Sequence, residues 1–471
     1  MQQSGDYLIK KRRQRDMSPN AFDVRERRFS AKTFSSPFLI SLIFLILITI
    51  GTILLLLPYA HYGSGFSDPI VAIFTATSAV TVTGLVIEPT HTYWTGFGQG
   101  VILALMFVGG LGIMTMAAFL LAILGQKVST SQKLLIRETM NTSNIGGIQS
   151  LSIAIVGTAI AIQLVGFILF LIRFVFIYPL DEAIWQSLFH SVSAFNNAGF
   201  LSFNSNEGLI EFQSDFIVIS IMTWLIIFGS LSFWVVADIF TKNHFRLYSL
   251  VSKIVIITTV FLIVLSSILF FFSERSNIET IGNLDLSNQI FISIFESVSG
   301  RTAGFTTIDY SAINDSTTII QTIMMFIGGA TGSVAGGIKV TTLFVIIVSI
   351  FALIRENPEI HVFKRHIDQD TVIRSYAILV ISLSFILLCA FLLSVTNEGF
   401  LFKDLIFDSV SAYGTVGLSS GVTPELNVIG KIVIVVTMFL GRIGPLIIGL
   451  RMIPNQENSG FRYPNETVTI G

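Results

Sequence analysis

Four short stretches of the chain place a glycine after small or β-branched residues, and each is followed by Phe or Leu. They are Val82-Thr83-Gly84, Asn197-Ala198-Gly199, Thr302-Ala303-Gly304 and Thr415-Val416-Gly417, with glycines 105 to 115 residues apart. A Phe-x-x-x-Ser pattern precedes each of them: Phe74 to Ser78, Phe189 to Ser193, Phe295 to Ser299 and Phe407 to Ser411. A nearly constant period of this size indicates a structural unit that is repeated four times.

A short apolar segment followed by a glycine turn is suited to holding a cation inside a membrane. Irregular backbone is tolerated at membrane depth only where it is buried in protein or lines a water-filled path. Rings of backbone carbonyl oxygens replace the hydration shell of a potassium ion in selectivity filters. Glycine suits such turns because it adopts backbone angles that other residues avoid. We therefore predict that the residues of these four stretches bind potassium ions as a selectivity filter.

The composition is typical of a polytopic membrane protein. Hydrophobic residues make up 52% of the chain and charged residues only 12%, whereas soluble domains carry roughly 25% charged residues. Residues 1–36 are rich in Lys and Arg, and we expect a basic cytoplasmic tail that is attracted to anionic lipid. The single cysteine, Cys389, excludes a disulfide framework and a cysteine metal site.

The elements that would hold the first turn follow one another in the sequence. The uncharged run from Pro37 to Leu57 is long enough to cross a ~30 Å hydrocarbon core as a helix. Asp68 and Pro69 then begin a segment of about 12 residues, which is too short to cross and fits a re-entrant pore helix. A second span over 98–124 completes the unit.

The same order recurs three more times. We expect spans over 148–172 and 216–237, over 254–272 and 318–354, and over 376–395 and 432–450, with the second and fourth pore helices beginning near Asp181 and Asp404. The predicted fold class is an all-α polytopic membrane protein with four span–pore helix–span repeats in pseudo-fourfold arrangement around one pore. It has eight spans and four re-entrant helices. The predicted domains are the N-terminal tail 1–36, the repeats 37–124, 148–240, 250–354 and 373–453, and a cytoplasmic C-terminal tail 454–471.

Lys and Arg in short loops mark the cytoplasmic side of a membrane protein. Basic residues lie between the units, among them Lys127, Arg246 and Arg355. We therefore expect a multi-pass protein of the plasma membrane, with both termini in the cytoplasm and the four turns open to the outside.

The third unit contains a second unusual stretch, the loop 328–339, which carries five glycines in ten residues. Its residues are Gly328, Gly329, Ala330, Thr331, Gly332, Ser333, Val334, Ala335, Gly336, Gly337, Ile338 and Lys339. Glycines disfavour a helix, so we predict a break in the membrane on the inner side of the filter, where the loop acts as a flexible gate. The alternative is a seam of small residues at which helices pack closely.

Two arginines lie within predicted membrane segments, where an ionisable residue suggests a function. Arg442 is the one charge within the predicted span 432–450. We predict that it contacts carbonyls of the gate loop or repels cations in the pore; the alternative is a structural anchor between helices. Arg301 stands inside the third turn, and we expect its side chain to point away from the ion path and to hold the turn in place.

Two motifs of soluble enzymes also match. Residues 417–421 fit the G-x-S-x-G pattern of serine hydrolases, with Ser419 as nucleophile. They lack the strand–turn–helix context, and no histidine lies beyond His366. Residues 332–339 resemble a phosphate-binding loop, but Ile338 separates Gly337 from Lys339. We therefore predict that the chain is not an enzyme, and an intramembrane serine hydrolase stays a remote alternative.

With the turns, the loop and Arg442 placed, residues 37–471 resemble the Trk/Ktr/HKT superfamily of cation transporters, and are most similar to the membrane subunits of bacterial Ktr potassium uptake systems. The resemblance implies potassium transport through a homodimer on a cytosolic ring of nucleotide-binding RCK subunits of the KtrA or KtrC kind. ATP and ADP would bind that ring and not this chain, and sodium stimulates some members. The resemblance also implies that the loop is the gate and that Arg442 is its neighbour.

A sodium-conducting or sodium/potassium cotransporting member of the same superfamily is the nearer alternative. Members of that type often carry serine at the first filter position, where this chain has Gly84. The sequence gives neither the coupling to sodium nor the position of a sodium site.

Overall fold

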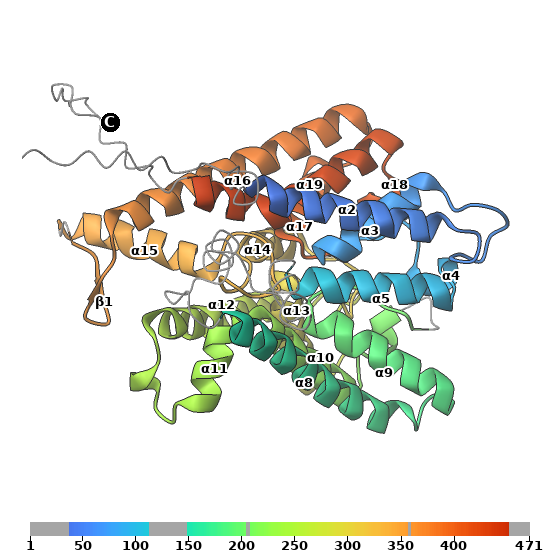
Figure 1. Cartoon of the computed structure of the whole chain (residues 1–471), viewed down its shortest axis with the longest axis horizontal. Helices are drawn as coiled ribbons and strands as arrows, with labels where there is room; N and C mark the ends of the chain where they lie inside the picture. The colour runs from blue at the N-terminus through green and yellow to red at the C-terminus, as the bar shows by residue number, and fades with distance from the viewer. Residues whose placement is uncertain (1–36, 113–147, 204–207, 357–358, 452–471) are drawn as a thin grey trace, which may run out of the picture.

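The computed structural model describes residues 37–112, 148–203, 208–356 and 359–451 (Figure 1). The predicted tails, 1–36 and 454–471, lie outside the described residues, as does the predicted second span beyond residue 112.

The first group of helices consists of α2 (Pro37–Leu56), α3 (Pro69–Thr81), the short α4 (Thr90–Tyr93) and α5 (Gly96–Gly110). The carboxylate of Asp68 accepts a hydrogen bond from the backbone N–H of Ile70 at 2.8 Å, and proline follows it in the first turn of the helix. Both features favour a helix start at this point. At 13 residues, α3 is too short to cross a bilayer.

Three more groups follow in the predicted order. The second has α8 (Ile148–Phe174), α9 (Leu180–Phe195), η1 (Gly208–Phe212), α10 (Phe216–Ser230), α11 (Phe233–Thr241) and η2 (Phe245–Leu247). The third has α12 (Leu250–Glu274), α13 (Leu286–Thr302), α14 (Asp315–Phe326) and α15 (Val340–Ile354), followed by the hairpin of β1 (His361–Val362) and β2 (Arg365–His366). The fourth has α16 (Gln369–Thr396), α17 (Phe402–Gly414), α18 (Val422–Glu425) and α19 (Val428–Arg451).

The helices pack in a closed series. Within each group the short helix contacts both of its long neighbours: α3 contacts α2 and α5, α9 contacts α8 and α10, α13 contacts α12 and α14, and α17 contacts α16 and α19. The groups are joined because α5 contacts α9, α10 contacts α13, α14 contacts α17, and α19 contacts α3. The last of these contacts joins the two ends of the chain, and the four short helices therefore surround a common centre.

Three helices of the described ranges are long and apolar enough to cross a membrane by themselves: residues 153–174 of α8, α12 and α16. The pair α10 and α11 would make a fourth if the two helices form one bent span. The eight spans expected from the sequence remain a prediction.

The helix over the predicted span 216–237 is interrupted. The helix ends at Ser230, and α11 begins again at Phe233 at an angle of 106° to α10. The side chain of Ser232 starts the new helix by accepting a hydrogen bond from the N–H of Val235 at 3.4 Å.

The break is stabilised by a segment distant in sequence. The carbonyl oxygen of Ser230 accepts a hydrogen bond from the N–H of Ala330 at 3.1 Å, and that of Gly229 accepts one from Val334 at 3.3 Å. In a continuous helix those oxygens would accept bonds from their own helix. The loop 328–339 thus takes the place of the next helical turn.

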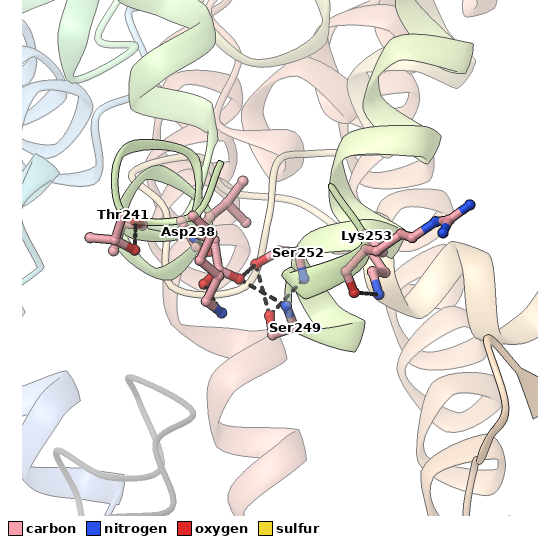
Figure 2. Close-up of polar contacts among 10 residues, drawn as sticks. Asp238, Thr241, Ser249, Ser252 and Lys253 are labelled. Carbon is pink, nitrogen blue, oxygen red and sulfur yellow. Dashed lines mark hydrogen bonds and ion pairs between the residues drawn. The ribbon is translucent and has the colours of Figure 1, made fainter. Parts of the chain in front are cut away.

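A polar cluster joins α11 to α12 at the end of the molecule that lies opposite α4 and α18 (Figures 1 and 2). The Asp238 carboxylate accepts hydrogen bonds from the N–H of Ser249 at 2.9 Å and the hydroxyl of Ser252 at 2.7 Å, and forms an ion pair with Lys242. A carboxylate at a helix N-terminus is favoured by the helix dipole. Asp238 therefore fixes the turn between the second and third groups.

Candidate functional site

The four glycine turns meet at the centre of the molecule. Each turn glycine lies against the carbonyl oxygen of the residue that precedes the glycine of a neighbouring turn. In order around the ring the pairs are Gly84 with Ala198, Gly199 with Ala303, Gly304 with Val416, and Gly417 with Thr83. The series closes on itself, so the structure brings together the four predicted stretches.

The turns adopt the left-handed backbone conformation at positions two residues apart. In three turns the first such residue is Val82, Asn197 or Thr415, with φ of 57°, 54° and 51°, and the second is the glycine. Residues other than glycine rarely adopt this conformation, and it persists where the surroundings hold it. The third turn differs because Thr302 still belongs to α13, and only Gly304 has a positive φ, of 70°.

The serine of each Phe-x-x-x-Ser pattern fixes its turn. The Oγ atoms of Ser78 and Ser411 accept hydrogen bonds from the N–H of the first and fourth turn glycines, at 3.0 and 3.1 Å. The hydroxyls of Ser193 and Ser299 donate to the carbonyl of the Phe that follows the glycine, at 2.8 and 2.5 Å. The pattern, found as a marker of the repeat, therefore has a structural role at every turn.

A buried carboxylate behind the fourth turn was not predicted. Asp408 accepts hydrogen bonds from the hydroxyl of Ser419 at 2.8 Å, from the N–H and hydroxyl of Ser420, and from the N–H and hydroxyl of Thr423. These residues form the segment that leaves the turn after Gly417. Ser419, the nucleophile of the hydrolase alternative, thus serves to hold this segment.

Glu296 has the same role in the third group. It accepts hydrogen bonds from the N–H and hydroxyl of Thr307 at 2.7 and 2.8 Å and from the hydroxyl of Tyr310 at 3.0 Å. Both carboxylates are fully buried and directly follow the Phe of the repeat pattern. A charge at that place in a short apolar helix is the signal that would have identified them.

The loop 328–339 is non-helical and separates α14 from α15, so the predicted break is present. Its two ends lie side by side, because the N–H of Gly328 donates to the carbonyl of Ile338 at 2.8 Å and that of Val340 donates to Gly329 at 3.1 Å. The hydroxyls of Thr331 and Thr341 are 3.0 Å apart. The loop is therefore an ordered element with its own hydrogen bonds.

The far part of the loop lies directly against the fourth turn. A Cβ atom added to Gly336 would overlap the side chain of Thr415 and would lie 2.9 Å from the carbonyl oxygen of Gly414. Gly332 and Gly337 have positive φ, of 79° and 66°. The glycines of the loop thus serve both a close approach and a backbone conformation that favours glycine.

Two cations hold the loop through its carbonyls. Arg442 donates from Nη1 to the carbonyl of Val334 and from Nη2 to that of Gly109 at 2.9 Å. Lys339 donates from Nζ to the carbonyl of Ala335 at 2.5 Å. The predicted contact between Arg442 and the loop is confirmed, and Arg442 also joins α19 to the end of α5.

Arg301 is buried beside the third turn, with a side chain only 1% exposed. Its Nη2 donates to the hydroxyl of Ser230 at 3.1 Å. Ser230 ends α10 and accepts the loop hydrogen bond from Ala330. Arg301 therefore connects the third turn to the place where the loop is held, in keeping with the expectation that it fixes the turn.

Comparison with protein families gives a match over nearly the whole chain. The model of the TrkH family, described as "Cation transport protein", matches residues 25–460. The matched range contains the four turns, the loop and Arg442.

Similar proteins are found among transporters. The chain is 37% identical to Ktr system potassium uptake protein B of Bacillus subtilis, over 93% of this chain and 97% of that protein. It is 34% identical to the potassium/sodium uptake protein NtpJ of Enterococcus hirae, over 93% of this chain and 98% of that protein. The crystal structure of the potassium transporter TrkH from Vibrio parahaemolyticus has the same fold, with a TM-score of 0.70 at 16% identity, over 92% of this chain and 86% of that one.

Proposed function

Because the chain belongs to the TrkH family of cation transport proteins, and is thus a transporter and not an enzyme, we propose that it takes up potassium as the ion-translocating subunit of a Ktr-type system. The observation that carries the proposal is the closed ring of four glycine turns. In such a ring the carbonyl oxygens of the turns replace the water around a potassium ion.

The proposed selectivity filter consists of the twelve predicted residues of the four turns. The alternating left-handed residues, the close contacts between neighbouring turns and the serine hydrogen bonds support it, because they hold the carbonyls in fixed positions. A fixed ring favours an ion of one size over another. The third turn differs in its backbone from the other three, because Thr302 is helical and lacks their positive φ.

The proposed architecture has four repeats, with boundaries at 37–124, 148–240, 250–354 and 373–453, and eight spans around one pore. The cyclic contacts between short helices and their neighbours support it. Both termini and the loops between repeats lie in the cytoplasm, because the N-terminal tail and those loops together carry most of the basic residues. The end of the molecule with α11 and the hairpin then faces the cytoplasm, and that with α4 and α18 faces outward (Figure 1).

The loop 328–339 is proposed as the gate. Its contact with Gly414 and Thr415 puts it against the start of the fourth turn, and its support is a set of hydrogen bonds to α10 and Arg442. Those bonds are few and end on backbone carbonyls, so the loop can exchange them for water when it moves. The alternative of a packing seam predicts that the loop never leaves this position.

The proposed partners are a second copy of the chain and a cytosolic ring of RCK subunits that bind ATP or ADP. The relative in B. subtilis is named as one protein of a Ktr system, which supports a regulatory partner. Purified protein alone should therefore show no ATP-dependent potassium flux. ATP-dependent flux from this chain by itself would contradict the partner model.

The test of the function is potassium uptake by bacterial cells that lack their own uptake systems. Cells that produce the chain should take up potassium at low external concentration, and a co-expressed RCK protein should increase the rate. A chain that reaches the membrane and yet gives no uptake under either condition would refute the proposal.

Sodium is the second candidate, as a cotransported ion or as the main one. The similarity to a potassium/sodium uptake protein favours it. Sodium uptake should be measured in the same cells with and without external potassium. Cotransport predicts sodium uptake only when potassium is present. Sodium as the main ion predicts sodium uptake without potassium, and a pathway for potassium alone predicts no sodium uptake.

A further inference from the structure

The hairpin between α15 and α16 carries two of the six histidines of the chain. Its antiparallel register places His361 directly opposite His366, and Val362 opposite Arg365. Side chains alternate between the two faces of a strand, so the two histidines share one face. Glu359 precedes the strand, and its carboxylate lies within hydrogen-bond distance of the His361 ring.

The three side chains lie close enough to share a ligand. One oxygen or nitrogen atom from each of Glu359, His361 and His366 lies within 4.8 Å of the other two. The Oε2 of Glu359 and the Nε2 of His361 are 2.9 Å apart. Two ligands at ~2.1 Å from a tetrahedral zinc ion lie about 3.4 Å apart, so only a small rotation of exposed side chains is needed.

The opposite face of the hairpin is anchored. Val362 and Ile367 are buried against Val345 of α15, and the N–H of Ile367 donates to the carbonyl of Ile360 at 3.0 Å. The other face is open, since the side chains of Glu359 and His361 are 65% and 52% exposed. Because the hairpin backbone is anchored, metal binding would need to order only the three exposed side chains and not the backbone that carries them.

We propose that Glu359, His361 and His366 form a surface site for a divalent transition metal of the zinc class. Two imidazoles and one carboxylate suit Zn²⁺ and its neighbours, whereas Mg²⁺ and Ca²⁺ prefer oxygen ligands alone. Three protein ligands leave one position for water or for a ligand from another molecule. The site is separate from the proposed potassium path, and its test does not depend on transport.

The test is titration of the full-length protein with Zn²⁺, after removal of any histidine tag, by isothermal calorimetry in detergent. All six histidines and the single cysteine lie within the described residues, so the rest of the chain adds no further histidine or cysteine ligand for zinc. We expect one saturable site per chain. The single changes His361→Ala and His366→Ala should each weaken binding by roughly tenfold or more, a loss at least as large as that from outer-shell changes.

The control is His244→Ala, which removes an exposed histidine from another loop and should leave binding unchanged. Co²⁺ gives a second readout, because its visible absorption bands should appear with the wild type and vanish with the double variant H361A/H366A. Each variant is first checked for an unchanged elution volume and unfolding midpoint. No saturable Zn²⁺ binding by the wild type, or unchanged binding by the folded double variant, would overturn the proposal.

Discussion

Gly84 shows how one residue can be constrained in two ways. Its φ is 91°, and an added Cβ atom would lie 2.6 Å from the carbonyl oxygen of Ala198. Gly65, in the loop after α2, has nearly the same φ of 89° but has no atom within 4 Å of such a Cβ. A substitution at Gly65 would therefore cause backbone strain alone, whereas the same substitution at Gly84 would also displace the neighbouring turn.

Gly84→Ser should lower the preference for potassium over sodium. The new side chain would push the Ala198 carbonyl out of the ring, and a change of ~1.4 kcal/mol in relative ion binding is tenfold in the ratio. The measurement is initial uptake of each ion under equal gradients. Gly65→Ser is the matched control and should keep the wild-type ratio. An unchanged ratio in Gly84→Ser would remove Gly84 from the filter.

Asp408→Asn should loosen the segment beyond the fourth turn. An amide offers one acceptor oxygen and places two donors where the carboxylate received bonds from Ser419, Ser420 and Thr423. Leaving a buried donor unsatisfied costs about 1–3 kcal/mol. We expect a lower thermal unfolding midpoint and weaker selectivity. Asp404→Asn removes the same charge from the first turn of the same helix and should do neither; equal effects of both changes would contradict the assigned role.

Residue types explain which parts of the site were predictable. The glycines and the serines recur at fixed places in four units, and Arg442 stands out as a charge in an apolar span. The position after the repeated Phe holds Thr75, His190, Glu296 and Asp408 in the four units. Because no residue type is repeated there, comparison of the units alone does not identify this position; the signal is the charge of Glu296 and Asp408 within short apolar helices.

The loop 328–339 and Arg442 act together at the scale of elements. Deletion of residues 331–336 and the change Arg442→Ala should both raise potassium flux and reduce dependence on the RCK partner. A hydrogen bond to a charged group contributes ~1.5–3 kcal/mol, which corresponds to a roughly ten- to hundredfold rise in the open fraction if the closed state dominates. The measurement is initial uptake at saturating potassium, corrected for the amount of protein in the membrane.

The deletion also distinguishes a gate from a packing seam. Arg442→Ala frees a carbonyl of α5 as well as one of the loop, so its effect alone has two explanations. The deletion acts on the loop directly. A variant that folds, reaches the membrane and conducts no faster than the wild type would identify residues 328–339 as a packing seam.

Gly441 marks a close approach between α19 and α17. A Cβ atom added there would overlap the carbonyl of Tyr413, whereas one added to Gly444 in the same helix would have no atom within 4 Å. Gly441→Ala should destabilise the protein by about 1–3 kcal/mol, as overpacking does. Gly444→Ala should be neutral or stabilising by up to ~1 kcal/mol, because alanine favours a helix. Thermal unfolding midpoints in detergent should rank in that order, and the reverse order would contradict this packing.

The sequence does not predict the break between α10 and α11. Its hydrophobic run is continuous over 216–237, which favours a single span. The carbonyls of Gly229 and Ser230 are satisfied by Val334 and Ala330, about a hundred residues away. In an apolar environment these carbonyls need hydrogen-bond donors, and here the donors come from a segment that is distant in sequence.

At the scale of the whole molecule, the repeat predicts the order of the helices but not every difference between the units. Equal units imply equivalent contacts, and the closure of α19 against α3 follows that rule. The third unit departs from it, with a helical Thr302 in its turn and a loop in its last helix. The glycines of the loop predicted the break in the last helix, whereas nothing in the repeated pattern predicted the helical Thr302.

The central claim is that all four turns form one ion-selective ring. The most direct measurement is the ratio of potassium to sodium uptake in proteoliposomes for the four single changes Gly84→Ser, Gly199→Ser, Gly304→Ser and Gly417→Ser, beside Gly65→Ser and Gly399→Ser. The outer pair has positive φ but open space around the new side chain. We predict that every change in the ring lowers the ratio and that neither outer change does. A ring glycine that can be replaced in a folded protein with no change in the ratio would contradict the claim.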